Sequence, residues 1–173
     1  MNTAPRNIGL FCCLALAGVM AGCGYTLGPT NGMTAGARSV GIRPFVNKTH
    51  EPRITEYLAM SLRREVQVDG TFRLQTSGAP DILVTGEITR FQRSGLSYTT
   101  NDILTPQEYV LGLDTHVIAR ETSSGRVVFD QVIRGSTFLR IGNDLGSSER
   151  EAIPVLTDNV ARATINQLAD GKW

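Results

Sequence analysis

Few side chains in this sequence could support catalysis. It contains two histidines, His50 and His116, and three cysteines, none of them beyond position 23. His116 follows Asp114 by two residues in an alternating segment, which would place both on one strand face, but no third ligand follows at metal-site spacing. Nucleophile-elbow, phosphate-loop, dinucleotide-binding and zinc-protease motifs are also missing from the sequence. We therefore expect no enzyme activity, no metal and no cofactor.

Arginine is the second residue type here that could form a binding site. Fifteen of the 17 basic residues are arginine, whose planar guanidinium binds phosphate or carboxylate through two parallel hydrogen bonds. Arg90 and Arg93 fall at the end of one expected strand, and Arg134 and Arg140 fall on the last one. This grouping predicts a shared patch that contacts an anionic glycolipid. The alternative is ordinary solvated charge on a sheet face.

The first 22 residues have the pattern of a lipoprotein signal peptide. Arg6 precedes an apolar run of about 13 residues, which is shorter than the roughly 20 needed to span a bilayer. The next residues, Ala21-Gly22-Cys23, resemble the bacterial lipobox, in which small residues precede a cysteine that receives diacylglycerol. Cys23 is the expected lipidation site, and secretion with ordinary cleavage near Ala21-Gly22 is the alternative.

Acylation would anchor the protein to a membrane through its N-terminal acyl chains. Residue 24 is glycine and not aspartate, which by resemblance to Gram-negative lipoproteins implies the outer membrane, on the periplasmic side. Residues 23–38 are glycine-rich and typical of a flexible tether, and residues 39–173 suffice for one domain. The balance of 17 basic against 16 acidic residues argues against nucleic-acid binding.

Apolar alternation predicts the strands. They are expected over residues 40–46, 71–76 and 81–93, and as a hairpin over 109–121 and 126–140. Residues 94–106 show no period and are expected to form a long loop.

Apolar residues that recur every three or four positions predict two helices. The first begins near Pro52 and ends near Gly70, and the second follows a capping box at Ser148 and Glu151. Pro154 falls in the first turn of a helix that starts after this box, or kinks one that starts at Ser148. The order β-α-β-β-β-β-α predicts an α+β fold with both helices on one face of a four- to five-stranded mixed or antiparallel sheet.

Several short motifs resemble one family, the lipopolysaccharide-assembly lipoprotein LptE. They are CGY-x-L directly after the leader, then VGIRPFVN, KTHEPRITEYL, VQVDGTFRL and PDILVTGEI, and they extend over much of the mature chain in order. The resemblance implies a non-enzymatic plug or scaffold inside the β-barrel LptD, which assists lipopolysaccharide assembly at the outer membrane. It places the acylation site at Cys23 and makes lipopolysaccharide itself a candidate ligand.

Two other functions remain open on the sequence alone. One is an envelope lipoprotein that activates a cell-wall synthase or scaffolds another envelope complex. The other is a membrane-anchored hydrolase whose catalytic residues assemble only in the folded chain.

Overall fold

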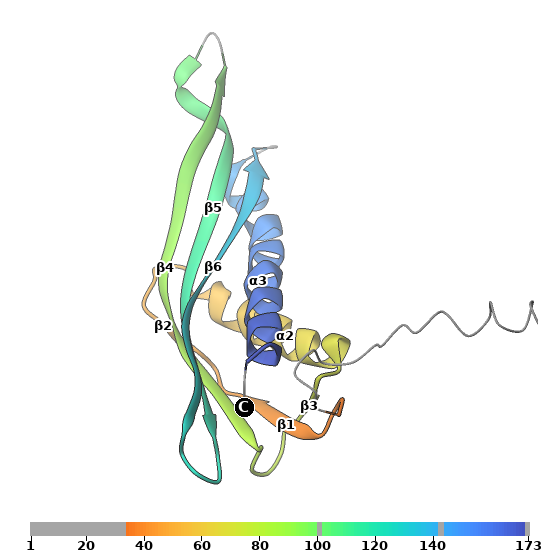
Figure 1. Ribbon diagram of the computed structural model, residues 1–173. Coiled ribbons are helices and arrows are strands. Elements are labelled where there is room, and N and C mark those ends of the chain that lie inside the picture. Colours follow the sequence, from red (N-terminus) through yellow and green to blue (C-terminus); the bar gives the residue numbers. More distant parts are fainter. Residues whose placement is uncertain (1–33, 100–101, 142–143, 172–173) are drawn as a thin grey trace, which may run out of the picture.

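Two helices lie on one face of a single sheet in the computed structural model, which describes residues 34–99, 102–141 and 144–171 (Figure 1). This confirms the predicted α+β fold. The elements, in chain order, are β1 (Arg38–Ile42), β2 (Val46–Asn47), α2 (Arg53–Asp69), β3 (Phe72–Leu74), β4 (Ile82–Thr99), β5 (Asp102–Glu121), β6 (Val127–Arg140) and α3 (Leu145–Ala169).

The sheet is mixed. Its strand order is β3-β1-β4-β5-β6, and the short β2 also pairs with β4. Strand β1 runs parallel to both β3 and β4, whereas β4, β5 and β6 form an antiparallel meander. The predicted hairpin is confirmed, since β5 and β6 pair from Glu108 opposite Arg140 to Arg120 opposite Val127.

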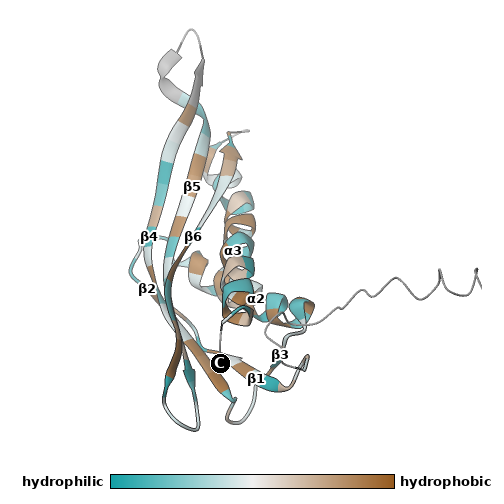
Figure 2. Ribbon diagram, in the orientation of Figure 1, coloured by the Kyte–Doolittle hydropathy of each residue, from teal (hydrophilic) through white to brown (hydrophobic). Residues whose placement is uncertain are grey.

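The core lies between the helices and the sheet. On β5, every second residue from Leu111 to Ala119 points toward the helices and is buried, as the alternation predicts. The same side of the sheet buries Ile82, Val84 and Ile88 of β4 and Phe129, Ile133 and Leu139 of β6. The helical stripes meet them from the other side, and Figure 2 shows apolar residues on both helices and on the strands. The buried helical residues include Ile54, Leu58, Leu62 and Val66 of α2 and Ile153, Leu156, Val160 and Leu168 of α3. Neither described helix combines the length and the apolar character needed to cross a bilayer.

A polar cluster joins the two helices. The Ser61 hydroxyl of α2 donates to Asp158 Oδ1 of α3 at 2.6 Å, and the Arg64 guanidinium pairs with the same carboxylate. Burial alone would raise the pKa of Asp158, but these hydrogen bonds and the positive charge more than offset it and lower the pKa below its usual value. The charged carboxylate thus helps to fix α2 against α3.

Two sequence predictions need correction. Residues 94–106 do not form a loop, because β4 continues to Thr99 and β5 starts at Asp102. The end of β4 pairs with the start of β5 in a two-stranded ribbon that extends beyond β6 (Figure 1). Backbone pairing holds these strand ends, so their sequence does not need alternating apolar residues. Helix α3 also begins before the predicted capping box, since Asp144 is its N-cap and accepts from the Ser147 backbone N–H at 2.8 Å. Pro154 therefore lies inside the helix.

Helix α3 approaches β6 most closely at Gly135. A Cβ atom there would lie 2.5 Å from Val160 Cγ2 and 3.5 Å from the backbone oxygen of Leu156. Only a glycine lets the helix backbone sit this near the strand. The contact fixes how α3 lies over the sheet.

Replacing Gly135 with alanine should therefore lower the free energy of unfolding by about 1–3 kcal/mol, because the helix must move away from β6. Gly112→Ala on the neighbouring strand is the matched control. Its Cβ would meet only the movable end of the Gln92 side chain, so we expect a change within about 0.5 kcal/mol. Urea unfolding of both variants measures the difference, and equal losses would contradict this account of the helix contact.

Candidate functional site

The face of β4, β5 and β6 that points away from the helices has no other element of the described chain packed on it (Figure 1). We call this surface the open face. The strand register assigns its residues, because neighbours directly opposite one another point to the same side. Its main members are Thr85, Glu87, Arg90 and Gln92 of β4, Gly112, Asp114, His116 and Ile118 of β5, and Asp130, Val132, Arg134, Ser136 and Phe138 of β6.

A charged row crosses the middle of the open face. Arg90, Asp114 and Arg134 lie directly opposite one another on the three strands. The Nε atom of each arginine is 3.9 Å from an oxygen of the Asp114 carboxylate. Contacts of this length, made by two largely exposed arginines, contribute little to folding, about 0–1 kcal/mol. The row is therefore available to a ligand or partner.

Two close polar pairs lie next to this row. His116 Nε2 is 2.6 Å from Asp130 Oδ1, across β5 and β6. Lys48 Nζ is 2.5 Å from Glu87 Oε2, and Glu87 lies directly opposite His116 on β4. Lys48, Arg90 and Arg134 are equal in number to Glu87, Asp114 and Asp130, so this part of the open face carries no large excess of either sign.

The open face also exposes apolar side chains. Phe138 of β6 is 75% exposed, and Val132 on the same strand is 48% exposed. Both point outward in phase with Arg134. An exposed phenylalanine beside a charged row is typical of a surface that binds another protein. The alternation along β6 already places Phe138 and Val132 on the same face as Arg134, but the sequence prediction considered only the polar residues of this face.

The four arginines predicted to share a patch do not lie together. Arg93 lies opposite Leu111, on the helix side of the sheet, and its Nη1 is 3.3 Å from Glu149 Oε2 of α3. Arg140 lies six residues beyond Arg134, about 20 Å along the strand, and pairs with Glu108 at 3.3 Å. Only Arg90 and Arg134 lie in one row, on either side of Asp114. The register shift between Ile88 and Arg90 sets the phase of this part of β4.

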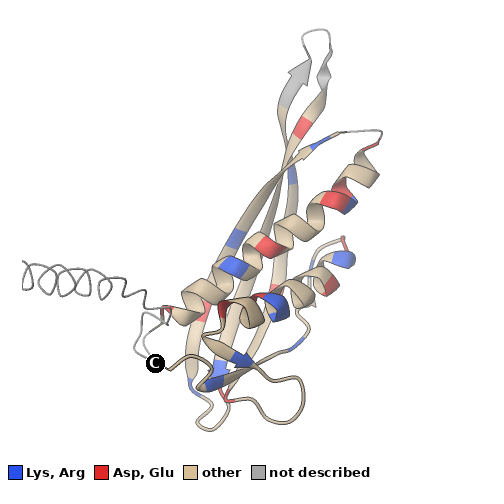
Figure 3. Cartoon of the chain, turned by 90° about the vertical axis from the view of Figure 1, so that its right-hand side faces the viewer, with Lys and Arg blue, Asp and Glu red and all other residues tan. Residues whose placement is uncertain are grey.

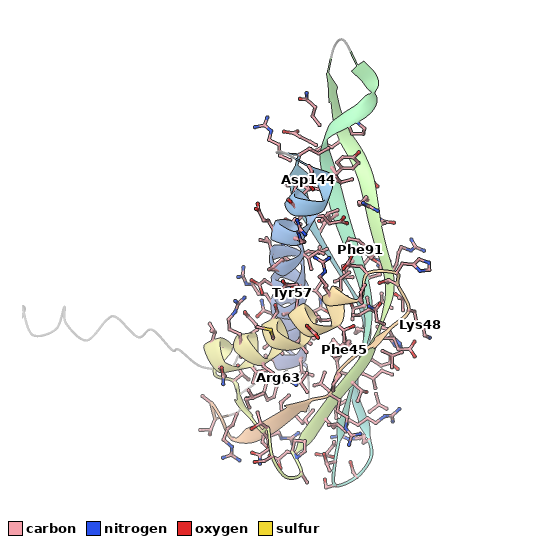
Figure 4. The ribbon with its side chains drawn as sticks, turned by 180° about the vertical axis from the view of Figure 1, so that it is seen from behind. Phe45, Lys48, Tyr57, Arg63, Phe91 and Asp144 are labelled. Carbon is pink, nitrogen blue, oxygen red and sulfur yellow. The ribbon has the colours of Figure 1, made fainter. Side chains whose placement is uncertain are left out.

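His50 lines a cavity of about 480 Å³ between the segment before α2 and β4. Arg93 and Glu149 form an ion pair at its wall, and Lys48, also in the lining, pairs with Glu87. Figure 4 shows Lys48 and Phe91, two of its residues, on neighbouring segments. Among the residues that the structure describes, no three histidine, cysteine, aspartate or glutamate side chains are placed to hold a metal ion. Cys23 lies outside the described residues.

Neither a family model nor a curated protein matches this sequence. Solved structures do match the fold. Protein CT253 from Chlamydia trachomatis is 9% identical with a TM-score of 0.56, and the match covers 76% of this chain and 95% of that one. Protein XCC0632 from Xanthomonas campestris, described under the family model DUF330, is 12% identical with a TM-score of 0.56, covering 76% and 84%.

A third match is the minor lipoprotein from Acinetobacter baumannii, which is 10% identical with a TM-score of 0.50 over 76% of this chain and 92% of that one. At these identities the likeness concerns the fold alone. The chain therefore has a fold that also occurs in bacterial lipoproteins.

The charged row gives a direct test of the predicted glycolipid contact. Arg90→Ala combined with Arg134→Ala should weaken binding of a phosphorylated glycolipid, whereas Asp114→Asn should strengthen it, because the amide no longer neutralises the two guanidinium groups. Arg140→Ala serves as the control, since Arg140 lies away from the row. Co-sedimentation with glycolipid vesicles measures all three. Unchanged binding by the double variant would remove the row as a glycolipid contact.

Proposed function

We propose that the mature protein is a non-enzymatic outer-membrane lipoprotein that works by docking its open face against the inner wall of an LptD-like β-barrel. The observation that carries this proposal is the open face itself, a three-stranded surface with paired charges and an exposed phenylalanine that nothing in the described chain covers. The lumen of a large outer-membrane barrel is polar, so its wall matches such a surface chemically.

The size of the body restricts the barrel. A folded chain of the described length has a radius of gyration of about 14 Å. Barrels of eight strands are filled by their own side chains, and those of about 16–18 strands enclose a water channel, whereas a plugged lumen occurs at about 22 strands. A partner that encloses this body must therefore have about 22 strands or more.

The N-terminal anchor supports the same proposal. The lipobox-like Ala21-Gly22-Cys23 would place acyl chains in the membrane that holds the barrel, and the tether would keep the domain beside it. The fold shared with lipoproteins agrees with this arrangement. Lipopolysaccharide contact at Arg90 and Arg134 belongs to the same proposal, since both residues would then lie between the domain and the barrel wall.

Replacing Cys23 with alanine should leave the leader uncleaved and abolish acylation. We expect the variant to accumulate as a precursor of higher mass, because the lipoprotein peptidase requires the modified cysteine. Mass spectrometry of the purified N-terminus measures this, and Cys13→Ala within the leader is the control that should process normally. A Cys23 variant that is cut and membrane-bound like the natural chain would refute lipidation.

A glutamate at Phe138 should abolish binding to the barrel without unfolding the protein, because the side chain is 75% exposed and would bring an unpaired charge into the interface. Val68→Glu on α2 is the matched control, since Val68 is 74% exposed but lies on the helix side. Affinity purification in mild detergent should recover a large heat-modifiable β-barrel with the natural chain and the Val68 variant only.

Other results of that purification would contradict the proposal. Recovery of a cell-wall synthase or another envelope complex in place of a barrel would favour the alternative of an activating lipoprotein. Loss of the barrel with Val68→Glu and not with Phe138→Glu would show that the helices, and not the open face, meet the partner.

A further inference from the structure

A second cavity, of about 430 Å³, lies where β1 and β3 end, away from the charged row. It is formed by the ends of these strands, the segment that connects β3 to β4, and Arg63 of α2. Figure 4 shows Arg63 on the side of α2 that faces β1. Cavities of this size hold small organic molecules.

Backbone contacts fix the walls of this cavity. The N–H of Arg43 donates to the Val84 carbonyl at 3.0 Å, and the N–H of Gln75 donates to the Val40 carbonyl at 2.9 Å. Gly41 lets the connecting segment lie directly against β1, since a Cβ there would be 2.7 Å from Pro80 Cγ. The cavity is therefore built on the sheet rather than on a free loop.

The charges around the cavity are all positive. Arg43 and Arg63 both line it, and none of its described lining residues is acidic. Neither arginine has an ion pair or a side-chain hydrogen bond with any residue that the structure describes, although Arg63 is half-buried. This differs from the cavity at His50, where Glu51 and Glu149 are among the lining residues.

An unpaired, half-buried guanidinium is costly, because its hydrogen-bond donors lose water without gaining an acceptor. Arg63 is such a group, and together with the exposed Arg43 at the same cavity it is stabilised when an oxyanion enters. The guanidinium forks match phosphate oxygens, and the side chains of Gln75 and Thr76 add neutral polar groups to the lining.

We propose that this cavity binds a phosphate monoester, with Arg43 and Arg63 holding the phosphate. The volume exceeds that of a phosphate ion, so the ligand carries an organic group that occupies the remaining space. Glycerol phosphate and the headgroup of phosphatidic acid share this chemistry. The proposal does not depend on the barrel partner.

The test uses the full mature protein in detergent micelles. Glycerol phosphate is titrated by calorimetry, and in a second arm the micelles contain phosphatidic acid, with phosphatidylcholine as the lipid control. The combined variant Arg43→Ala and Arg63→Ala should bind at least about tenfold more weakly, as expected for lost charge-assisted hydrogen bonds. The matched control, Arg150→Ala with Arg162→Ala, removes the same charge from the exposed side of α3, away from the cavity, and should keep its affinity within about twofold.

The two arms identify the source of the phosphate. Binding of both probes indicates a soluble ester site, and binding of phosphatidic acid alone indicates a lipid headgroup site. Arg43→Lys with Arg63→Lys keeps the charge but lacks the fork, so it should restore part of the affinity and separates binding from misfolding. The proposal is overturned if neither probe binds, or if the cavity variant binds as tightly as the natural chain.

Discussion

Helices α2 and α3 both pack against the inner face of the sheet, and the surface of β4, β5 and β6 on the other side therefore has no partner within the described chain. Gly135 allows α3 to lie close to β6 on this inner face, and the cluster at Asp158 joins α2 to α3. Most of the apolar residues of β4, β5 and β6 face the helices, so the outward residues do not have to fill the core. Stability and recognition are thus divided between the two faces.

Wherever burial imposes a period, the sequence predicts the structure well. The hairpin of β5 and β6 and the stripes of both helices follow from apolar spacing, because each must cover one side of the core. Residues 94–106 were misjudged because their ribbon has no third strand and no helix to cover it, so pairing alone holds it and leaves no periodic signal. The helix start at Asp144 was missed because a capping box stood a few residues later.

The site was harder to predict because it depends on strand phase and register. Arg90 and Arg93 are three residues apart and point to opposite sides of the sheet, which separates two residues that the sequence places together. The alternation along β6 also places Phe138 and Val132 on the same face as Arg134. The cavity at Arg63 forms because the segment between β3 and β4 packs against β1 at Gly41. No local sequence pattern predicts this contact.

The two candidate recognition regions differ in electrostatics, although the whole chain is close to neutral. On the open face, Asp114 lies between two arginines and Lys48 pairs with Glu87, so a partner meets balanced charge and gains mainly from shape and from Phe138. Figure 3 shows that the opposite, helical side also carries both signs of charge. At the cavity, Arg43 and Arg63 have no such carboxylate, and an incoming anion need not displace one. A neutral protein wall therefore suits the first region, and a phosphate suits the second.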